Sequence, residues 1–251
     1  MFAKAQREYF YLPMLIGGLQ KISLIDFPGK IASVIFTQGC NFRCPFCHNG
    51  HLVDPAQFGA TLSEDEVWDY LSSRKGRLEG VVISGGEPTL QKDLKAFMQK
   101  IKELGFCLKL DTNGTKPDIV ANLARSNLVD FIAMDIKHDF SKYDAACSVK
   151  TLVKSIMQSI DFVKTCGVDY EFRTTIVPGI HRGSDIVSIA KNISGAKKFV
   201  IQEFVPDHAM DNNLRHETEE SLFGLAHRAE LENIRAECLH YVADFEIRFA
   251  H

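Results

Sequence analysis

Short apolar runs alternate with amphipathic segments along most of the chain. Runs rich in β-branched residues predict strands, and segments with apolar residues three and four positions apart predict helices. The predicted strands are 31–37, 80–83, 106–110, 131–136, 170–177, 198–204 and 243–249. The predicted helices are 63–75, 91–104, 117–125, 151–165, 184–193 and 217–238. This alternation indicates right-handed βαβ units and a parallel sheet.

Local signals refine this pattern at the N-terminal end. Leu15–Ile25 predicts a short hairpin or strand pair around Gly17-Gly18, followed by a turn over 26–30. Ser63 with Glu66 three residues later forms a capping box that opens the first helix. Six βα units are too few for a closed eight-fold barrel. We therefore predict an α/β fold, an open, TIM-like partial (β/α)6 barrel with a short N-terminal hairpin.

Composition narrows the function classes. A chain of 251 residues with 45% hydrophobic and 24% charged residues is typical of a globular protein, and its length suits one large domain. We expect an N-terminal extension and hairpin over 1–26 and a core domain over 27–251. The formal charge of −3 argues against nucleic-acid binding. Without a membrane-length apolar run or a clear signal peptide, we expect a cytoplasmic protein with no membrane partner.

Three of the seven cysteines lie close together in QGCNFRCPFCHNG, residues 38–50. Cys40, Cys44 and Cys47 have the spacing C-x3-C-x2-C, so their thiolates can converge on one inorganic centre. Thiolate suits iron–sulfur clusters, zinc or copper(I). A 4Fe–4S cluster normally takes four cysteines, so three would leave one iron open to a substrate or cofactor. The alternative is a structural zinc site with His48 as the fourth ligand.

The other cysteines, Cys107, Cys147, Cys166 and Cys238, lie far apart in the sequence. The odd total and the tight triplet argue against a secreted disulfide framework. We expect these four to be buried or unremarkable thiols, because free cysteine behaves as a small hydrophobic residue.

Polar or glycine-rich segments follow six consecutive predicted strands. They are 40–47, 85–87, 111–113, 135–137, 173–179 and 206–208. Active sites of parallel α/β barrels lie at these strand ends. Gly85-Gly86 could form only a sharp turn, or could let a ligand approach the backbone closely. Arg173 stands in an apolar strand, where an unpaired charge is costly, so we expect it to point into a polar lumen.

Together these segments resemble the radical S-adenosylmethionine (SAM) enzymes, in the branch of glycyl-radical enzyme activases. The resemblance rests on the cysteine triplet, CHN, VVISGGEPTLQ, LDTNG, MDIK and RTTIVPG, and covers roughly residues 17–210. GLQKISLIDFPGKIASVIFTQGCNFRCPFCHN is similar to the longer activating proteins of anaerobic ribonucleoside-triphosphate reductases. The resemblance implies a 4Fe–4S cluster, SAM and an electron donor such as flavodoxin or ferredoxin. It also implies a glycyl-radical enzyme as partner, with anaerobic ribonucleotide reductase preferred.

The resemblance also implies roles for individual residues. Cys40, Cys44 and Cys47 would ligate the cluster. The residues implied to bind SAM are Phe46, His48, Gly85, Gly86, Glu87, Asp111, Thr112, Asn113, Met134, Asp135 and His208. Among these, 85–87 would hold the amino group of SAM. Asp111, Thr112, Met134 and Asp135 match positions that can hold a monovalent cation beside the SAM carboxylate. Lys137 and Arg173 would act at that carboxylate or at the substrate.

Two alternatives remain open. The chain could be a radical SAM enzyme that modifies a small molecule or a nucleobase, as deazapurine synthases do. It could also be a non-catalytic iron–sulfur or zinc binding module. A simple binding module would not require the polar segments at the other strand ends, so those segments favour an enzyme.

The cysteine triplet generates a test of metal content. Anaerobic reconstitution should give about four irons and four sulfides per chain, the stoichiometry of a cubane. Stoichiometric zinc without iron uptake, measured by metal analysis of the anaerobically purified protein, would contradict this prediction.

Overall fold

The strands of the described chain form one sheet whose strand order follows the chain order. The computed structural model describes residues 14–216, 221–224 and 227–249, apart from the side chains of residues 208 and 216. The strands are β1 (Ile16–Ser23), β2 (Ala32–Thr37), β3 (Gly80–Gly85), β4 (Cys107–Thr112), β5 (Phe131–Asp135), β6 (Asp169–Ile176), β7 (Phe199–Glu203) and β8 (Phe245–Arg248). β1 runs antiparallel to β2, and each later strand runs parallel to the one before it.

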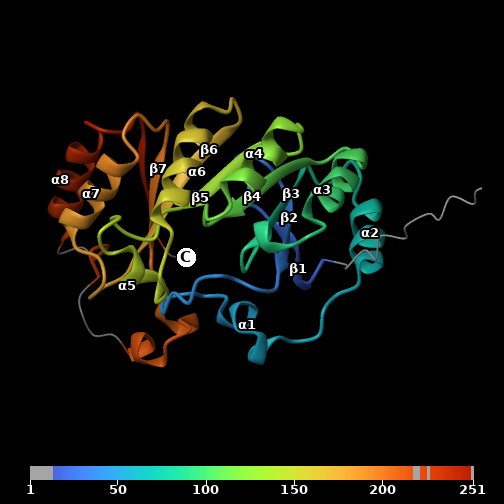
Figure 1. Ribbon diagram of the computed structural model, residues 1–251, viewed down its shortest axis with the longest axis horizontal. Coiled ribbons are helices and arrows are strands. Elements are labelled where there is room, and N and C mark those ends of the chain that lie inside the picture. The colour runs from blue at the N-terminus through green and yellow to red at the C-terminus, as the bar shows by residue number, and fades with distance from the viewer. Residues whose placement is uncertain (1–13, 217–220, 225–226, 250–251) are drawn as a thin grey trace, which may run out of the picture.

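The sheet is open, because β1 and β8 are its two edges. Helices connect the successive parallel strands, and Figure 1 shows them following one another along one side of the sheet. The connecting helices are α2 (Glu64–Ser73), α3 (Leu94–Glu103), α4 (Pro117–Arg125), α6 (Val153–Thr165), α7 (Gly183–Asn192) and α8 (Arg228–Cys238). This arrangement confirms the predicted partial (β/α)6 barrel.

Burial explains why these segments form these elements. β3 buries its first four residues because the lumen lies on one face and helices lie on the other. The amphipathic α3 buries Leu94, Phe97, Met98 and Ile101, which is the face predicted from their spacing. The predicted capping box of α2 is present.

Two predicted elements were placed wrongly. The segment 15–25 is not a hairpin of its own: it forms the single strand β1, which pairs with β2 across the predicted turn at 26–30. Gly17 lies within β1, and a Cβ there would come within 2.5 Å of the Leu52 side chain, so this glycine makes room for the cysteine loop. The predicted helix 217–238 begins only at Arg228; residues 221–224 form a turn, and 217–220 lie outside the described residues.

Two short helices were not predicted. α1 (Gly50–Val53) follows the cysteine loop, and α5 (Tyr143–Cys147) follows the end of β5. In Figure 1 both lie below the sheet, away from the row of connecting helices. Helices of four or five residues have too few positions to show a period. In the described part of the chain, no helix is both long and apolar enough to cross a bilayer.

An ion pair between a buried carboxylate and a partly exposed arginine joins β6 to the edge strand β8. The Glu171 side chain is 1% exposed, and its two oxygens accept hydrogen bonds of 3.0 and 2.7 Å from Arg248. β7 lies between these two strands in the sheet, so the ion pair links the edge strand to a strand inside the sheet.

We predict that Arg248→Met lowers the free energy of unfolding by about 3 kcal/mol, because Glu171 would stay buried without a counter-charge. The double variant Glu171→Gln/Arg248→Met should recover most of that loss. Equilibrium urea unfolding measures both. A loss below about 1 kcal/mol, the range of exposed ion pairs, would contradict the structural importance of this pair.

Candidate active site

One cavity of about 320 Å³ lies at the carboxyl ends of the parallel strands. Most of the residues singled out from the sequence line it. They are Cys40, Cys44, Phe46, Cys47, His48, Gly85, Gly86, Glu87, Asp111, Thr112, Asn113, Asp135, Lys137 and Arg173. Met134 is not among the lining residues, and the side chain of His208 lies outside the described part of the structure. The expectation that six strand ends meet at one site is therefore largely met.

The three clustered cysteines differ in their surroundings. Burial raises the pKa of the Cys40 thiol to about 12 and also raises the pKa of Cys47. The neighbouring Cys147 thiol lowers the pKa of Cys44, and the pKa of Cys147 is raised.

The zinc alternative requires a tetrahedral Cys3His set. Within 14–216, 221–224 and 227–249, no group of three or more His, Cys, Asp or Glu side chains is placed to hold one metal ion. The His48 ring instead stacks on Phe204, with 5.6 Å between ring centroids. The described chain therefore presents neither a preformed Cys3His site nor three cysteines preformed around a single metal ion.

Helix α5 packs against the cysteine loop. The Phe42 ring meets Tyr143 edge-on at 6.2 Å, and the Arg43 N–H donates to the Cys147 carbonyl at 2.9 Å. The Tyr143 hydroxyl accepts a hydrogen bond of 3.1 Å from the backbone N–H of Lys137. One short helix thus holds the loop against the end of β5.

The two adjacent glycines after β3 allow close backbone packing. Gly85 has φ +113°, which favours glycine, and a Cβ there would lie 2.3 Å from the Thr37 backbone nitrogen. A Cβ on Gly86 would lie 2.2 Å from the carbonyl oxygen of Gly39. The close approach expected of these glycines is thus to the protein backbone just before the first cysteine, although both also line the cavity.

Glu87 joins three strand ends through its carboxylate, which is 1% exposed, and its backbone N–H. One oxygen accepts hydrogen bonds from the backbone and hydroxyl of Thr89 and from the Thr112 hydroxyl; the other accepts from the Asn113 N–H at 2.7 Å. The Glu87 N–H donates to the Gly39 carbonyl at 2.8 Å. Burial raises the pKa of Glu87 in spite of these donors. Glu87 therefore lines the cavity and also holds the strand ends together through its hydrogen bonds.

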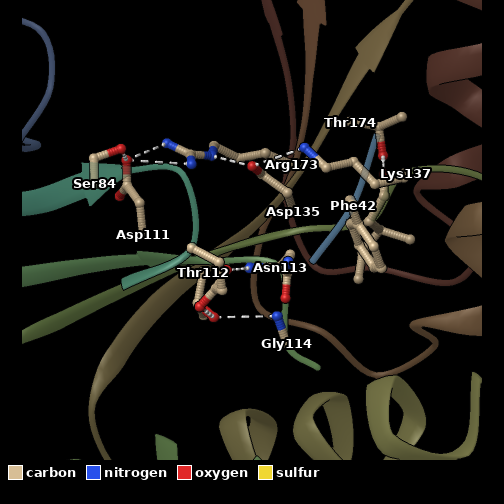
Figure 2. Close-up of polar contacts among 12 residues, drawn as sticks. Phe42, Ser84, Asp111, Thr112, Asn113, Gly114, Asp135, Lys137, Arg173 and Thr174 are labelled. Atoms are coloured by element: carbon tan, nitrogen blue, oxygen red, sulfur yellow. Dashed lines mark hydrogen bonds and ion pairs between the residues drawn. The ribbon is translucent and has the colours of Figure 1, made fainter. Parts of the chain in front are cut away.

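Five charged side chains form an alternating row across β4, β5 and β6. Lys109 lies 3.1 Å from Asp111, Arg173 contacts Asp111 at 3.4 Å and Asp135 at 2.9 Å, and Lys137 lies 3.1 Å from Asp135. Figure 2 shows Arg173 between the two carboxylates. Burial alone would raise the pKa of Asp135, but the Arg173 and Lys137 cations lower it to about 2. As expected, Arg173 is paired and faces the cavity.

Of the four residues expected to hold a monovalent cation, Asp111, Thr112 and Asp135 line the cavity, and each of these three side chains is paired with another side chain. Arg173 pairs with both Asp111 and Asp135. The Thr112 hydroxyl donates to Glu87. Met134 is fully buried, and its side chain lies against Gly114, where an added Cβ would come within 2.0 Å of it.

Phe46 is fixed through a buried histidine. Its ring meets His181 edge-on at 6.0 Å. The Val177 N–H donates to Nδ1 of His181, so Nε2 carries the hydrogen and donates to the Lys137 carbonyl at 2.9 Å. Burial lowers the pKa of His181 to about 4, so the ring stays neutral near pH 7. Sequence reasoning did not select His181.

Other cavity residues were also missed. Thr175 on β6 and Gln202 on β7 line the cavity and are directly paired in the sheet register. Thr175 stands two residues after Arg173, and alternate strand residues face the same side. The same rule relates Lys109 to Asp111. Polar residues at alternate positions of an otherwise apolar strand were the available signal.

Fold and site define an α/β-barrel enzyme with thiols, a glycine–glutamate turn and a charged row at its strand ends. A family model described as the radical SAM superfamily matches residues 34–191. The chain belongs to this superfamily, which implies a 4Fe–4S cluster and SAM as its cofactors.

Sequence relatives point to one branch of the superfamily. A protein of Methanocaldococcus jannaschii named as a candidate glycyl-radical enzyme activating enzyme is 37% identical over 80% of this chain and 84% of the relative. The pyruvate formate-lyase-activating enzyme of Clostridium pasteurianum is 29% identical over 79% of this chain and 84% of the relative. The chain is thus a radical SAM enzyme of the activase-like kind.

A solved structure supports the fold. Streptococcus suis SuiB bound to its precursor peptide SuiA superposes with a TM-score of 0.67 and 16% identity. The match covers 87% of this chain and 48% of SuiB, so this chain spans about half the length of that protein.

The contact between Gly86 and Gly39 predicts that Gly86→Ala lowers iron content several-fold, because the added methyl group would displace the backbone just before Cys40. Gly59→Ala is the matched control, since a Cβ at Gly59 meets no atom within 4 Å. Iron analysis after anaerobic reconstitution measures the effect. Equal iron in both variants and the wild type would contradict the proposed coupling between the glycine turn and the cysteine loop.

Proposed function

We propose that this chain is an activating enzyme that generates a glycyl radical on a partner enzyme. The observation that carries the proposal is the placement of three cysteines, the Glu87 turn and the Lys137–Arg173 row around one cavity. The sequence relatives named as activating enzymes support the same function.

Cys40, Cys44 and Cys47 fit a 4Fe–4S cluster, because they bring three thiols to one cavity and leave one iron for SAM. Cluster binding would displace protons from these thiols, as thiolate is the ligand form. When bound, the cluster would supply one electron to SAM, and the resulting carbon radical would take a hydrogen atom from the substrate.

The charged row suits the carboxylate of SAM. Two of its cations, Arg173 and Lys137, line the cavity and are placed to meet that carboxylate, whereas Lys109 does not line the cavity and pairs with Asp111. Phe46 lines the cavity and would pack on the adenine. A monovalent cation beside Asp111 and Asp135 would have to compete with Arg173 for both carboxylates.

The neutral polar residues that line the rest of the cavity suit a polypeptide substrate. In the described part of the chain, the side chains of Thr175 and Gln202 make no hydrogen bond, although both line the cavity. Neutral donors and acceptors of this kind match the amide groups that flank a glycine. The preferred partner is an anaerobic ribonucleotide reductase, supplied with electrons through a flavodoxin or ferredoxin. This preference rests on the resemblance of the N-terminal segment and the cysteine loop.

The experiment is electron paramagnetic resonance (EPR) of the candidate reductase after anaerobic incubation with this protein, SAM and a reductant. We expect a doublet organic radical that disappears when the reductase glycine is replaced by alanine, or when Cys44→Ala replaces the wild-type activase. Thr175→Val and Gln202→Leu should lower the radical yield while leaving iron content unchanged.

Absence of the radical, together with turnover of a purine-like small molecule, would overturn the proposal. That result would instead favour a radical SAM enzyme of the nucleobase-modifying kind.

A further inference from the structure

Two buried histidines connect the loops that follow β5 and β6. His138 lies three residues after the end of β5, and His181 lies five residues after the end of β6. They are 2% and 6% exposed, and their rings stack with 4.7 Å between centroids and 17° between planes. Neither histidine is among the residues that line the cavity. The pair therefore lies behind the site rather than within it.

Each histidine donates a hydrogen bond to the backbone of the other loop. Nδ1 of His138 accepts from the Asp139 N–H at 2.7 Å, so its Nε2 carries the hydrogen, as in His181. Nε2 of His138 then donates to the Ile180 carbonyl at 3.1 Å. Nε2 of His181 donates to the Lys137 carbonyl at 2.9 Å. The two hydrogen bonds run in opposite directions between the loops.

These hydrogen bonds begin where the pairing of β5 with β6 ends. The strand register stops at Asp135, and the Ile136 N–H still donates to the Arg173 carbonyl at 2.7 Å. One residue further on, the Lys137 carbonyl has moved beyond the reach of the sheet, and His181 supplies its donor. Because a carbonyl removed from water requires a donor, this contact fixes the Lys137 backbone against the loop after β6.

We propose that His181 is a positioning residue that sets Phe46 for the adenine of SAM and Lys137 for its carboxylate, while His138 holds the His181 ring in place. His181 contacts both residues, through its ring edge-on to Phe46 at 6.0 Å and through its donor to the Lys137 carbonyl. Phe46 and Lys137 both line the cavity. This inference rests on the proposed placement of SAM. One buried ring thus couples the two ends of the cofactor site, and fixed geometry of this kind controls how a bound group is oriented.

The test is anaerobic equilibrium dialysis of the reconstituted protein against SAM and, separately, against 5′-deoxyadenosine, which carries the adenine but no carboxylate. His181→Phe keeps a ring against Phe46 but has no donor for the Lys137 carbonyl. Its SAM affinity should fall about tenfold, the scale of one hydrogen bond, while its 5′-deoxyadenosine affinity stays at the wild-type value. His181→Gln keeps a donor but no ring, so both affinities should fall by the same factor. His240→Gln is the matched control, because His240 is exposed and its ring contacts the Glu237 carbonyl.

Three results at equal iron content would overturn the proposal. They are unchanged SAM affinity in His181→Phe, equal losses of both ligands in that variant, and unchanged 5′-deoxyadenosine affinity in His181→Gln. His138→Gln provides a further variant in case the His181 variants do not retain the cluster. It keeps a donor for the Ile180 carbonyl but loses the stacked ring, so both affinities should fall several-fold, and wild-type affinities would again overturn the proposal.

The dialysis needs no partner enzyme, so the affinities of the variants are independent of the proposed glycyl-radical function. A wild type with full iron content that binds no SAM would overturn this inference together with the placement of SAM.

Discussion

A carboxylate removed from water must have its hydrogen bonds supplied by the protein, and in this chain that requirement organises the active site. Glu87 accepts from Thr89, Thr112 and Asn113, while its own N–H binds Gly39. The ends of β2, β3 and β4 are thereby held at fixed separations. Because Gly39 immediately precedes Cys40, the junction also sets where the cysteine loop begins.

The row of charged side chains in the lumen meets the same requirement, that a charge removed from water must be compensated by the protein. Asp111 and Asp135 lie in a largely enclosed space, where each requires a compensating cation, and Arg173 serves both. The positions of Lys109 and Lys137 follow from the register of the parallel strands, since residues two apart share a face. A fixed arrangement of this kind keeps a bound reactive group in one orientation.

The fold could be predicted from the sequence because most strands and connecting helices are long enough to show the period of their apolar residues. The boundaries of α4 were predicted without error, since Pro117 marks its first turn. α5 was missed because five residues carry no periodic signal. Cys147 was expected to be an unremarkable buried thiol, and it is buried, but the hydrogen bond from the Arg43 N–H to its carbonyl joins segments about a hundred residues apart and has no local signature. The same holds for His181 beneath Phe46.

The central claim is that the three clustered cysteines hold the cluster that cleaves SAM. The most direct measurement is the release of 5′-deoxyadenosine from anaerobically reduced protein incubated with SAM alone, quantified by chromatography. Slow release by the wild type and none by Cys44→Ala is the predicted result. Equal release by both proteins, or none by a wild type that carries four irons per chain, would contradict the claim.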